Sequence, residues 1–399
     1  MAQVTNEELV RKAVIATDAL ASTGKLNPAQ ADKFIDYVVD VTGLKDNARV
    51  IRFRNEQLNI DKIGVGKRVA MPATESVSPS ARRGLTTSQV QLKPVEIIVP
   101  FEIGDTFREI NLEGDNIEDH IVKMMATQLA NDLETLYIEG DTLGRADLDG
   151  NINDGGSLSQ YIVDSYLALQ DGWLKLARAG NAVDMQGANV GASAFSKMLN
   201  ALPAKFKRNR KNLRFICSID LEQFYREKVA TRATSSGDSA LSSNDNLTPY
   251  GIPLVPFPLF PLKPRTVEHV VLTGTTPAAL LHANIANVVV LPSTLAQVDT
   301  TPYVETTDYV VDYVNGTVAR NGGGAIGSGA TVKVTYDGSP QMILTHMDNF
   351  IVGIGRDIRI ERDRDIFKRV NQYAITVKVA VTLEEVTALT WAKNFGTSV

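Results

Sequence analysis

The sequence predicts an α+β protein organised around one long helix and one long β-ribbon. Apolar residues recur at helical spacing through segment 116–139. They are Ile117, Ile121, Met124, Met125, Leu129, Leu133 and Leu136. This helix would be about twice the average length of about 11–12 residues. Two extended runs, at about 50–71 and 88–104, flank a polar segment and predict the ribbon.

The composition is that of an ordinary folded protein. The 399 residues, 44% hydrophobic and 22% charged, are enough for two or three domains or for one large one. The formal net charge is −5, so a surface of cations for nucleic acid is not a property of the whole chain. The single cysteine, Cys217, excludes an internal disulfide framework. Because it lies in the apolar run LRFICSI, we expect a buried structural thiol rather than a reactive one.

No targeting or membrane segment is recognisable. The N-terminus lacks a basic region followed by an apolar block, so no secretion signal is predicted. No run approaches the 18 or so apolar residues needed to span a bilayer. We therefore expect folding in a reducing cytoplasm and no membrane partner.

The segment that precedes the ribbon predicts two amphipathic helices, over 5–22 and about 27–43. Thr5 and Glu8 form a capping-box pair at the start of the first helix, and Asn27-Pro28 provides a cap and a first-turn proline for the second. Two short helices build no core of their own. They need a partner surface.

The ribbon also needs a surface on which to pack. At about 3.3 Å per residue its arms would reach on the order of 60 Å. An isolated two-stranded ribbon is marginally stable in water, and no later segment obviously supplies the surface on which it would lie. We therefore expect that surface on another copy of the chain.

The middle of the chain predicts alternating helices and strands. Helices are expected over 157–179, 192–202 and 221–231, the last one capped by Asp220. Leu213–Ser218 is predicted to be a buried strand, and the proline-rich segment 251–261 suits a sheet edge. Short apolar strands are predicted at 267–272 and 288–291.

The last hundred residues are predominantly β. Asn315-Gly316 between two short strands predicts a hairpin with a type I′ turn, within a small β module inserted at 300–340. Alternation over 373–381 predicts a half-buried strand. Between short strands at 349–360 and that strand lies a charged segment, 361–369. Residues 386–395 are predicted to form a short helix or turn.

Candidate sites for chemistry fail on spacing, so the chain is predicted not to be an enzyme and to bind no cofactor or metal. Gly64-Val-Gly-Lys67 lacks the first glycine and the Ser/Thr of a phosphate-binding loop. Gly353-Ile-Gly355 lacks the third glycine of a dinucleotide fingerprint, and a tight bend in a strand is expected there. Segment 147–158 lacks the glycine and glutamate of a calcium loop. The four histidines are scattered without metal-site spacing.

Two charged segments leave more than one interpretation open. Segment 205–211, KFKRNRK, has five cations in seven residues and predicts either contact with nucleic acid or contact with subunits and solvent. Segment 361–369 mixes both signs, which suits a salt-bridged interface better than a catalytic pair. Contacts between subunits are predicted at Lys62, Lys67, Arg68, Arg82, Arg83, Arg362, Asp363, Arg364 and Asp365.

In the order of its segments the chain resembles the major capsid proteins of tailed double-stranded DNA bacteriophages, which share the fold named after phage HK97. The ending NFIVGIGRDIRIERDRDIFKRVNQYAITVKVAVTLEEVTALTWAKN and the segment GIPLVPFPLFP are especially similar to that family. The resemblance implies these domains: an N-terminal arm, 1–49; an extended E-loop hairpin, 50–104; a peripheral domain, 105–212, with a spine helix, 116–139; an axial domain, 213–342, including the β insertion 300–340; and a return to the peripheral domain, 343–399.

The resemblance also implies partners. Subunits of the family form hexamers and pentamers that close into an icosahedral shell around double-stranded DNA, with the E-loop over one neighbour and the N-terminal arm crossing to another. A virion component assembled in the host cytoplasm is expected, together with a separate scaffolding protein and a portal, since no helical leader precedes the arm. The insertion is where a decoration protein or an adjacent capsomer would make contact. Lys62 or Lys67 is the candidate for the lysine–asparagine cross-link that some relatives form.

Three functions remain open from the sequence. The first is a structural subunit of a phage head, and the second is the shell of an encapsulin-type compartment, which shares the fold but encloses enzymes. The third is a nucleic-acid-binding protein that uses 205–211. Genomic neighbours would separate the first two, and salt-dependent binding would identify the third.

Overall fold

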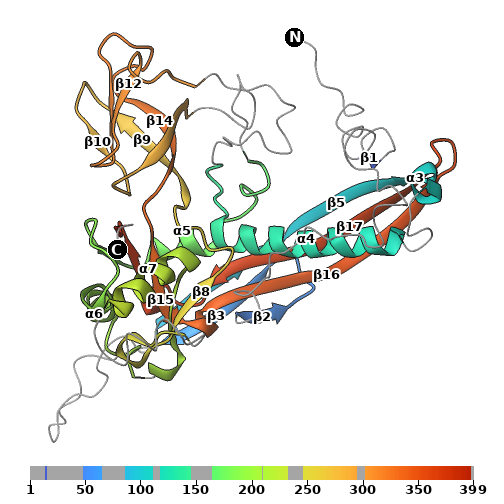
Figure 1. Ribbon diagram of the computed structural model, residues 1–399, viewed down its shortest axis with the longest axis horizontal. Coiled ribbons are helices and arrows are strands. Elements are labelled where there is room, and N and C mark those ends of the chain that lie inside the picture. Colours follow the sequence, from blue (N-terminus) through green and yellow to red (C-terminus); the bar gives the residue numbers. More distant parts are fainter. Residues whose placement is uncertain are drawn as a thin grey trace, which may run out of the picture.

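The computed structural model describes residues 14–15, 48–64, 86–110, 117–144, 164–208, 210–231, 246–293 and 302–396. Its central element is helix α4, Ile117–Glu139, which lies lengthwise along a twisted five-stranded sheet (Figure 1). The strands, in the order in which they lie in the sheet, are β1 (Val14–Ile15), β5 (Val95–Gly104), β17 (Val370–Leu383), β16 (Phe350–Asp365) and β2 (Arg49–Arg52). A short helix, α3 (Asp105–Ile110), follows β5.

The long helix predicted over 116–139 is confirmed, because its apolar period matches the surface that covers it. Leu129, Leu133 and Leu136 are buried in one cluster with Val377 and Val379 of β17. The N–H of Gly140 donates to the Leu136 carbonyl at 3.0 Å, which ends the helix where the sequence predicted. Asp115, which by its position could cap this helix, lies outside the described residues.

The polypeptide leaves α4 through a close crossing of two backbone segments. The N–H of Gly172 donates to the Gly140 carbonyl at 2.7 Å. A Cβ on Gly172 would lie 2.6 Å from the Gly140 nitrogen, so neither position has room for a side chain. Around this crossing residues 165–170 are turns, and the helix is only α5, Trp173–Ala177. The helix predicted over 157–179 is therefore wrong for its described part, apart from this single turn.

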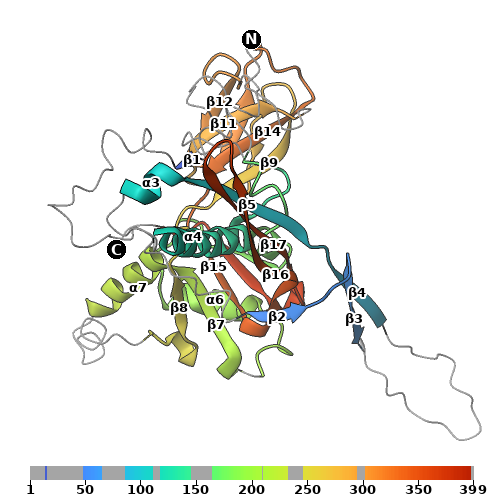
Figure 2. The ribbon, with the colours of Figure 1, turned by 90° about the vertical axis from the view of Figure 1, so that its right-hand side faces the viewer.

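The two arms of the predicted ribbon do not pair along their whole length. β5 pairs antiparallel with β17, and β2 pairs in parallel with β16, so most of the second arm but only the start of the first arm belongs to the main sheet. Only β3 (Leu58–Gly64) and β4 (Thr86–Leu92) pair with each other, and this short ribbon projects from the body (Figure 2). For the parts of the arms in the main sheet, the expectation that no later segment covers them is wrong, because β16 and β17 of the same chain pair with β2 and β5. For the β3–β4 ribbon, the surface on another copy stays a prediction. The predicted polar tip falls in 65–85, outside the described residues.

Of the two helices predicted before the ribbon, only residues 14–15 are described by the structure. Val14 and Ile15 form a two-residue strand, β1, opposite Glu102 and Ile103 of β5. A continuous helix over 5–22 is therefore wrong, because these two residues take the parallel edge of the sheet. The remainder of 1–47, including the predicted helix at 27–43, lies outside the described residues.

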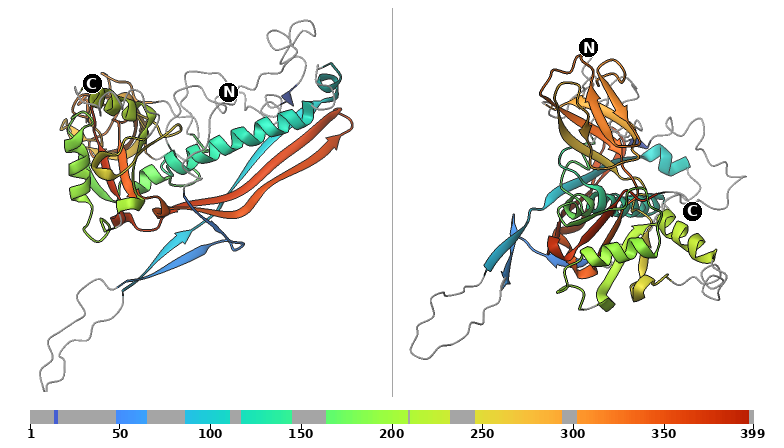
Figure 3. Two further views of the ribbon diagram at one scale, coloured as in Figure 1. Left: turned by 60° about the horizontal axis from the view of Figure 1, so that its bottom comes forward. Right: turned by 90° about the vertical axis from the view of Figure 1, so that its left-hand side faces the viewer.

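A second five-stranded sheet lies at the end of α4 where that helix finishes (Figure 3). Its strand order is β6 (Asn181–Asp184), β18 (Thr390–Lys393), β15 (Met342–His346), β7 (Leu213–Ser218) and β8 (Leu254–Phe257). The apolar faces of α6 (Ala192–Ala201) and α7 (Ile219–Ala230) pack with it in one core. Short 3-10 turns complete the unit at Arg210–Asn212, Pro249–Gly251, Met347–Asn349 and Val386–Ala388.

Several predictions for this unit are confirmed and others need correction. Helix 192–202, the buried strand at 213–218 and the edge position of 251–261 are confirmed. The cap of α7 is Ser218, which accepts from the Leu221 N–H, whereas Asp220 lies in the first turn. The segment predicted as a short helix or turn at 386–395 contains strand β18, because β15 offers it an edge to pair with. A domain boundary between 212 and 213 would divide this single core.

The third unit is a β module that projects from the body (Figure 1). One sheet contains β11 (Ala286–Pro292), β14 (Ala330–Asp337) and β9 (Arg265–Leu272), and the other contains β10 (Ala278–Ala279), β13 (Thr317–Arg320) and β12 (Tyr309–Asp312). The module is larger than the insertion predicted at 300–340, because β14 is the central strand between β11 and β9. The predicted hairpin is confirmed, but its turn has four residues, since Asp312 pairs with Thr317 and only Gly316 has a positive φ, of 64°.

Candidate assembly surfaces

The charged segment 361–369 is the end of a long hairpin formed by β16 and β17. These strands have 16 and 14 residues, and they run beside α4 to its far end (Figure 3). The sequence indicated only short strands here, because β16 beyond Arg356 is an exposed edge that carries charges in place of alternating apolar residues. Charged side chains on an edge strand discourage unwanted strand pairing.

Arg362 forms contacts within its own chain. Its guanidinium lies 3.1 Å from a Glu118 carboxylate oxygen at the start of α4 and packs over the Tyr373 ring at 5.6 Å. Glu118 is 8% exposed and also accepts from the Tyr373 hydroxyl at 2.9 Å and from the Asn371 amide. Burial, together with this hydrogen bond to Glu118, raises the pKa of Tyr373 to about 12. The cluster fixes the start of α4 to β17.

Arg364 and Asp365 also form contacts within their own chain. The Arg364 guanidinium lies 3.0 Å from the carboxylate of Asp105, which is buried at the start of α3. The Asp365 side chain accepts from the N–H groups of Phe367 and Lys368 at 3.0 and 3.1 Å. Such aspartate-to-backbone bonds hold a turn in one conformation. The turn is therefore ordered by local hydrogen bonds and anchored to the body through α3.

This ordered turn exposes two large apolar side chains. Phe367 is 100% exposed and Ile366 is 75% exposed. Single exposed apolar residues are common on protein surfaces, but an aromatic ring fully in water at the end of a fixed hairpin has no structural role inside its own chain.

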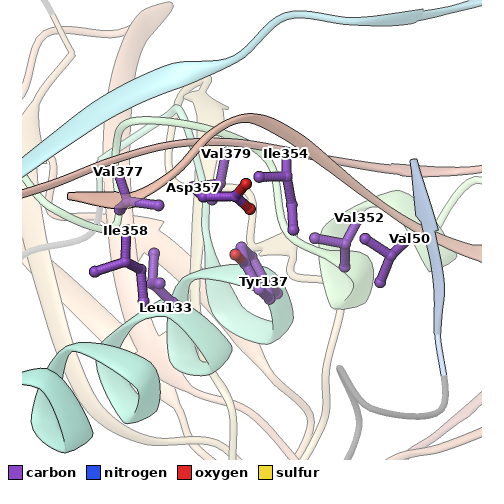
Figure 4. Close-up of a pocket in the computed structure, with 9 residues that line it drawn as sticks. All are labelled: Val50, Leu133, Tyr137, Val352, Ile354, Asp357, Ile358, Val377 and Val379. Atoms are coloured by element: carbon purple, nitrogen blue, oxygen red, sulfur yellow. The ribbon is translucent and has the colours of Figure 1, made fainter. Parts of the chain in front are cut away.

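An apolar pocket of about 350 Å³ lies at the opposite end of the same hairpin (Figure 4). Its walls come from α4, β2, β16 and β17. The lining residues are Val50, Leu133, Tyr137, Val352, Ile354, Asp357, Ile358, Val377 and Val379. Only Asp357 among them is charged.

Two irregularities in β16 shape this pocket. The register between β16 and β17 shifts between Ile354 and Arg356 and again between Arg356 and Arg359. Each shift places one extra residue on β16, and bulges of this kind bend a strand and redirect its side chains. Asp357 and Ile358 lie in the bulged stretch and border the opening. The tight bend expected at Gly353–Gly355 is therefore a bulged strand, and Gly353 is required because a Cβ there would lie 2.7 Å from the Phe53 ring.

Apart from Asp363, the remaining predicted contact residues belong to the predicted ribbon. The Lys62 ammonium lies 3.4 Å from the Glu385 carboxylate of the same chain. This arrangement gives no support to Lys62 as the cross-linking lysine, and an isolated surface pair of this kind contributes about 0–1 kcal/mol. Lys67, Arg68, Arg82 and Arg83 lie outside the described residues. Asp363 accepts from the adjacent Arg364 N–H.

The basic segment 205–211 is anchored by its aromatic residue. Phe206 packs against the core of the second sheet, and its carbonyl contacts His346 Nε2 at 3.1 Å. The Lys205 ammonium lies 4.5 Å from the Phe206 ring centre. Among the described residues no carboxylate forms an ion pair with the five cations. The two interpretations of this segment both remain predictions.

The β module meets the body through a buried polar layer. The Lys175 ammonium lies 2.6 Å from Asp141 and 2.7 Å from Asp171. Burial alone would raise the pKa of Asp171, but the hydrogen bonds from Lys175 and Thr142 together outweigh it, so the pKa is lowered. Arg178 donates to the Thr266 hydroxyl of β9 at 3.2 Å. His282 is 1% exposed between the rings of Tyr336 in the module and Trp391 in the second sheet.

The described part of the chain does not assemble a recognisable catalytic or metal centre. No group of three or more His, Cys, Asp or Glu residues within it could hold a metal ion. Cys217 is fully buried, and burial raises the pKa of its thiol, as expected for a structural cysteine. Within the same residues no helix is both long and apolar enough to cross a membrane.

Comparison with solved structures identifies the class of fold. The satellite phage P4 procapsid that includes size determination (Sid) protein is similar at 10% identity with a TM-score of 0.51, and the match covers 95% of both chains. The capsid of a native GTA particle matches at 13% identity with a TM-score of 0.48 over 95% of this chain and 98% of that one. The first likeness shows a capsid fold.

Comparison with curated proteins adds a relative in sequence. The chain is 28% identical over 382 residues to the protein named "Putative prophage capsid protein YqbE" of Bacillus subtilis (strain 168), covering 95% of this chain and 96% of that protein. No protein-family model matches. The resemblance to phage major capsid proteins that the sequence predicted is confirmed, and the relatives point to a structural rather than a catalytic role. The encapsulin and nucleic-acid-binding alternatives are not favoured.

Proposed function

We propose that this chain is the structural subunit of a phage head, which self-assembles into a closed icosahedral shell. The observation that carries the proposal is the similarity to a prophage capsid protein over 95% of the chain, together with a capsid fold. The open architecture supports it, because the β3–β4 ribbon and the β module extend from the body rather than fold onto it (Figures 1 and 2). Elements of this shape bury their surfaces against neighbours.

In this proposal α4 is the spine helix of a peripheral domain that includes the sheet of β1, β5, β17, β16 and β2. The β3–β4 ribbon with segment 65–85 is the E-loop, which lies over a neighbouring subunit, and segment 1–47 is the arm that crosses to another. The second sheet and its helices form the axial domain. The β module extends from that domain as the element available to an adjacent capsomer or a decoration protein.

The partners follow from the same proposal. Copies of the chain form hexamers and pentamers around packaged double-stranded DNA, with a separate scaffolding protein and a portal directing closure. The particle is a virion component that assembles in the host cytoplasm. Charged contacts between subunits are proposed at Lys67, Arg68, Arg82 and Arg83 of the ribbon tip and at the exposed faces of Arg362, Asp363, Arg364 and Asp365.

Negative-stain electron microscopy of the purified chain, alone and with the scaffolding protein, tests the proposal. We expect closed shells from the wild-type chain. Replacement of 73–87 by a Gly/Ser loop of equal length is expected to block closure while leaving tryptophan fluorescence unchanged, and the same replacement of 234–245 serves as the matched control. A chain that remains a lone globule under all assembly conditions would refute the proposal.

A further inference from the structure

We propose that the hairpin turn Ile366–Phe367 of one subunit inserts into the apolar pocket at the base of the β16–β17 hairpin of a second subunit. The inference rests on the proposed function, since it describes one contact of the shell. It assigns the partner of two features that the fold itself leaves unexplained: a fully exposed phenylalanine and an apolar pocket that opens to solvent.

The turn has the properties of a docking element. Asp365 fixes its backbone through two N–H groups, and the Arg369 carbonyl accepts from the Asp105 N–H at 3.0 Å. Phe367 is therefore presented on a held loop, and a group that is ordered before binding loses less conformational entropy when it docks. Aromatic anchors that fill a pocket supply much of the binding energy at protein interfaces.

The pocket has the size and chemistry to receive these side chains. Its volume of about 350 Å³ exceeds the roughly 150 Å³ of an apolar cavity known to hold benzene, which leaves room for a phenyl ring and an adjoining aliphatic side chain. Its walls are aliphatic apart from Tyr137 and Asp357 (Figure 4). Ile358 at the opening and Ile360, two residues further along β16, are each 48% exposed.

Charge complementarity orients the contact. Asp357, on the rim, pairs with Arg52 at only 3.6 Å, and both side chains are largely exposed, at 67% and 74%. In the turn, Lys368 and Arg369 directly follow Phe367. When Phe367 enters the pocket, these cations approach the Asp357 carboxylate. The apolar and charged parts of the turn thus match those of the pocket.

The occupant has to come from a second copy. Ile354 in the pocket and Ile366 in the turn are twelve residues apart along the same hairpin, which corresponds to about 40 Å in an extended strand. The paired strands and α4 hold these two ends apart (Figure 3). A contact between the tip of one subunit and the base of the next is head-to-tail, and repeated contacts of this type generate rings when the rotation closes.

Thiol cross-linking between two singly substituted chains tests this contact. Ile366→Cys, which keeps the Phe367 ring, is placed in one chain and Ile358→Cys in another. Both chains keep Cys217, whose burial keeps the background of cross-linking low. The chains are mixed under assembly conditions and oxidised. We expect a covalent dimer only in the mixture. Val310→Cys, at an equally exposed valine of β12, replaces Ile358→Cys in the control mixture and is expected to give none.

Each outcome decides the contact. A dimer formed by Ile366→Cys alone means that the turns of two subunits meet each other, and it overturns the proposal. No dimer in the mixture also overturns it. Electron microscopy of the wild-type chain reports separately on the proposed function. Shells without the mixed dimer support the function and refute the contact. The mixed dimer without shells supports a contact between two copies and refutes the function.

Assembly measurements give a second test. We expect Phe367→Ala to raise the concentration at which shells form by about tenfold or more, because each contact then loses a buried aromatic ring. Phe367→Leu keeps much of the apolar area and is expected to fall between Phe367→Ala and the wild type. Val310→Ala is the surface control. Equal assembly of Phe367→Ala and the wild type would overturn the proposal.

Discussion

The buried imidazole of His282 makes a quantitative prediction about acid. The ring is 1% exposed where the β module meets the second sheet. Burial, and then the nearby cations Arg178 and Lys393, lower its pKa from the usual 6.5 to about 3. Since the folded pKa is below the unfolded one, the unfolded chain binds the proton more readily between these values. Stability is therefore complete above pH 6.5 and falls as the pH drops toward 3.

The magnitude follows from linkage. Each pH unit below 6.5 removes about 1.4 kcal/mol, so lowering the pH from about 7 to about 5 costs about 2 kcal/mol from this residue alone. Urea unfolding followed by tryptophan fluorescence is a suitable assay, because Trp391 packs against His282 with ring centres 5.8 Å apart. His282→Gln removes the titrating group and is expected to lose about 2 kcal/mol less than the wild type over that interval.

His269→Gln is the matched control, because His269 is an exposed histidine on β9 of the same module. We expect this variant to follow the wild type at both pH values. Any loss of packing in His282→Gln adds an offset that does not depend on pH, so the slope is the informative quantity. If the wild type and His282→Gln lose equal stability on acidification, the pH dependence arises elsewhere and the reasoning about the junction is wrong.

Three further predictions test the packing of the body. Gly172→Ala should lower the free energy of unfolding by about 1–3 kcal/mol, because the added Cβ would overlap backbone atoms. Gly323→Ala is the control, because no atom lies within 4 Å of the added Cβ. Equal urea midpoints for the two variants would refute the prediction. Glu118→Ala should lower the free energy of unfolding by about 2–4 kcal/mol, because two buried donors lose their acceptor, and Glu118→Gln should lower it less. A larger loss in Glu118→Gln than in Glu118→Ala would contradict this prediction. Cys217 should resist a thiol reagent until urea unfolds the chain, and rapid native labelling would disprove its burial.

Local patterns predicted the elements that carry their own signal. The helix at 117–139 was visible because its apolar period persists over 23 residues and one face is covered throughout. The strand at 373–381 alternates because β17 lies between β5 and β16, with one face against α4. The hairpin at 309–320 was visible from its Asn-Gly turn.

Pairing between distant segments had no such signal. β5 pairs with β17, and nothing near Val95 indicates that its partner begins at Val370. β16 was hidden for a different reason: its bulges interrupt the alternation, and its edge position replaces apolar residues by charges. The pocket and the exposed turn were missed together with it. An apolar dipeptide, Ile366-Phe367, inside a charged run was the one available clue.

In the proposed shell, α4 and the hairpin would link the contacts that a subunit makes at distant points. Near its base the hairpin holds the ribbon, since Phe53 and Leu92 pack in one cluster with Ile351 and Ala380. At its far end Glu118 and Asn371 join it to the start of α4. Between these points a continuous buried core joins helix and sheet. A closed shell requires fixed angles between successive contacts, and a body that is stiff from end to end converts the geometry of one contact into that of the next.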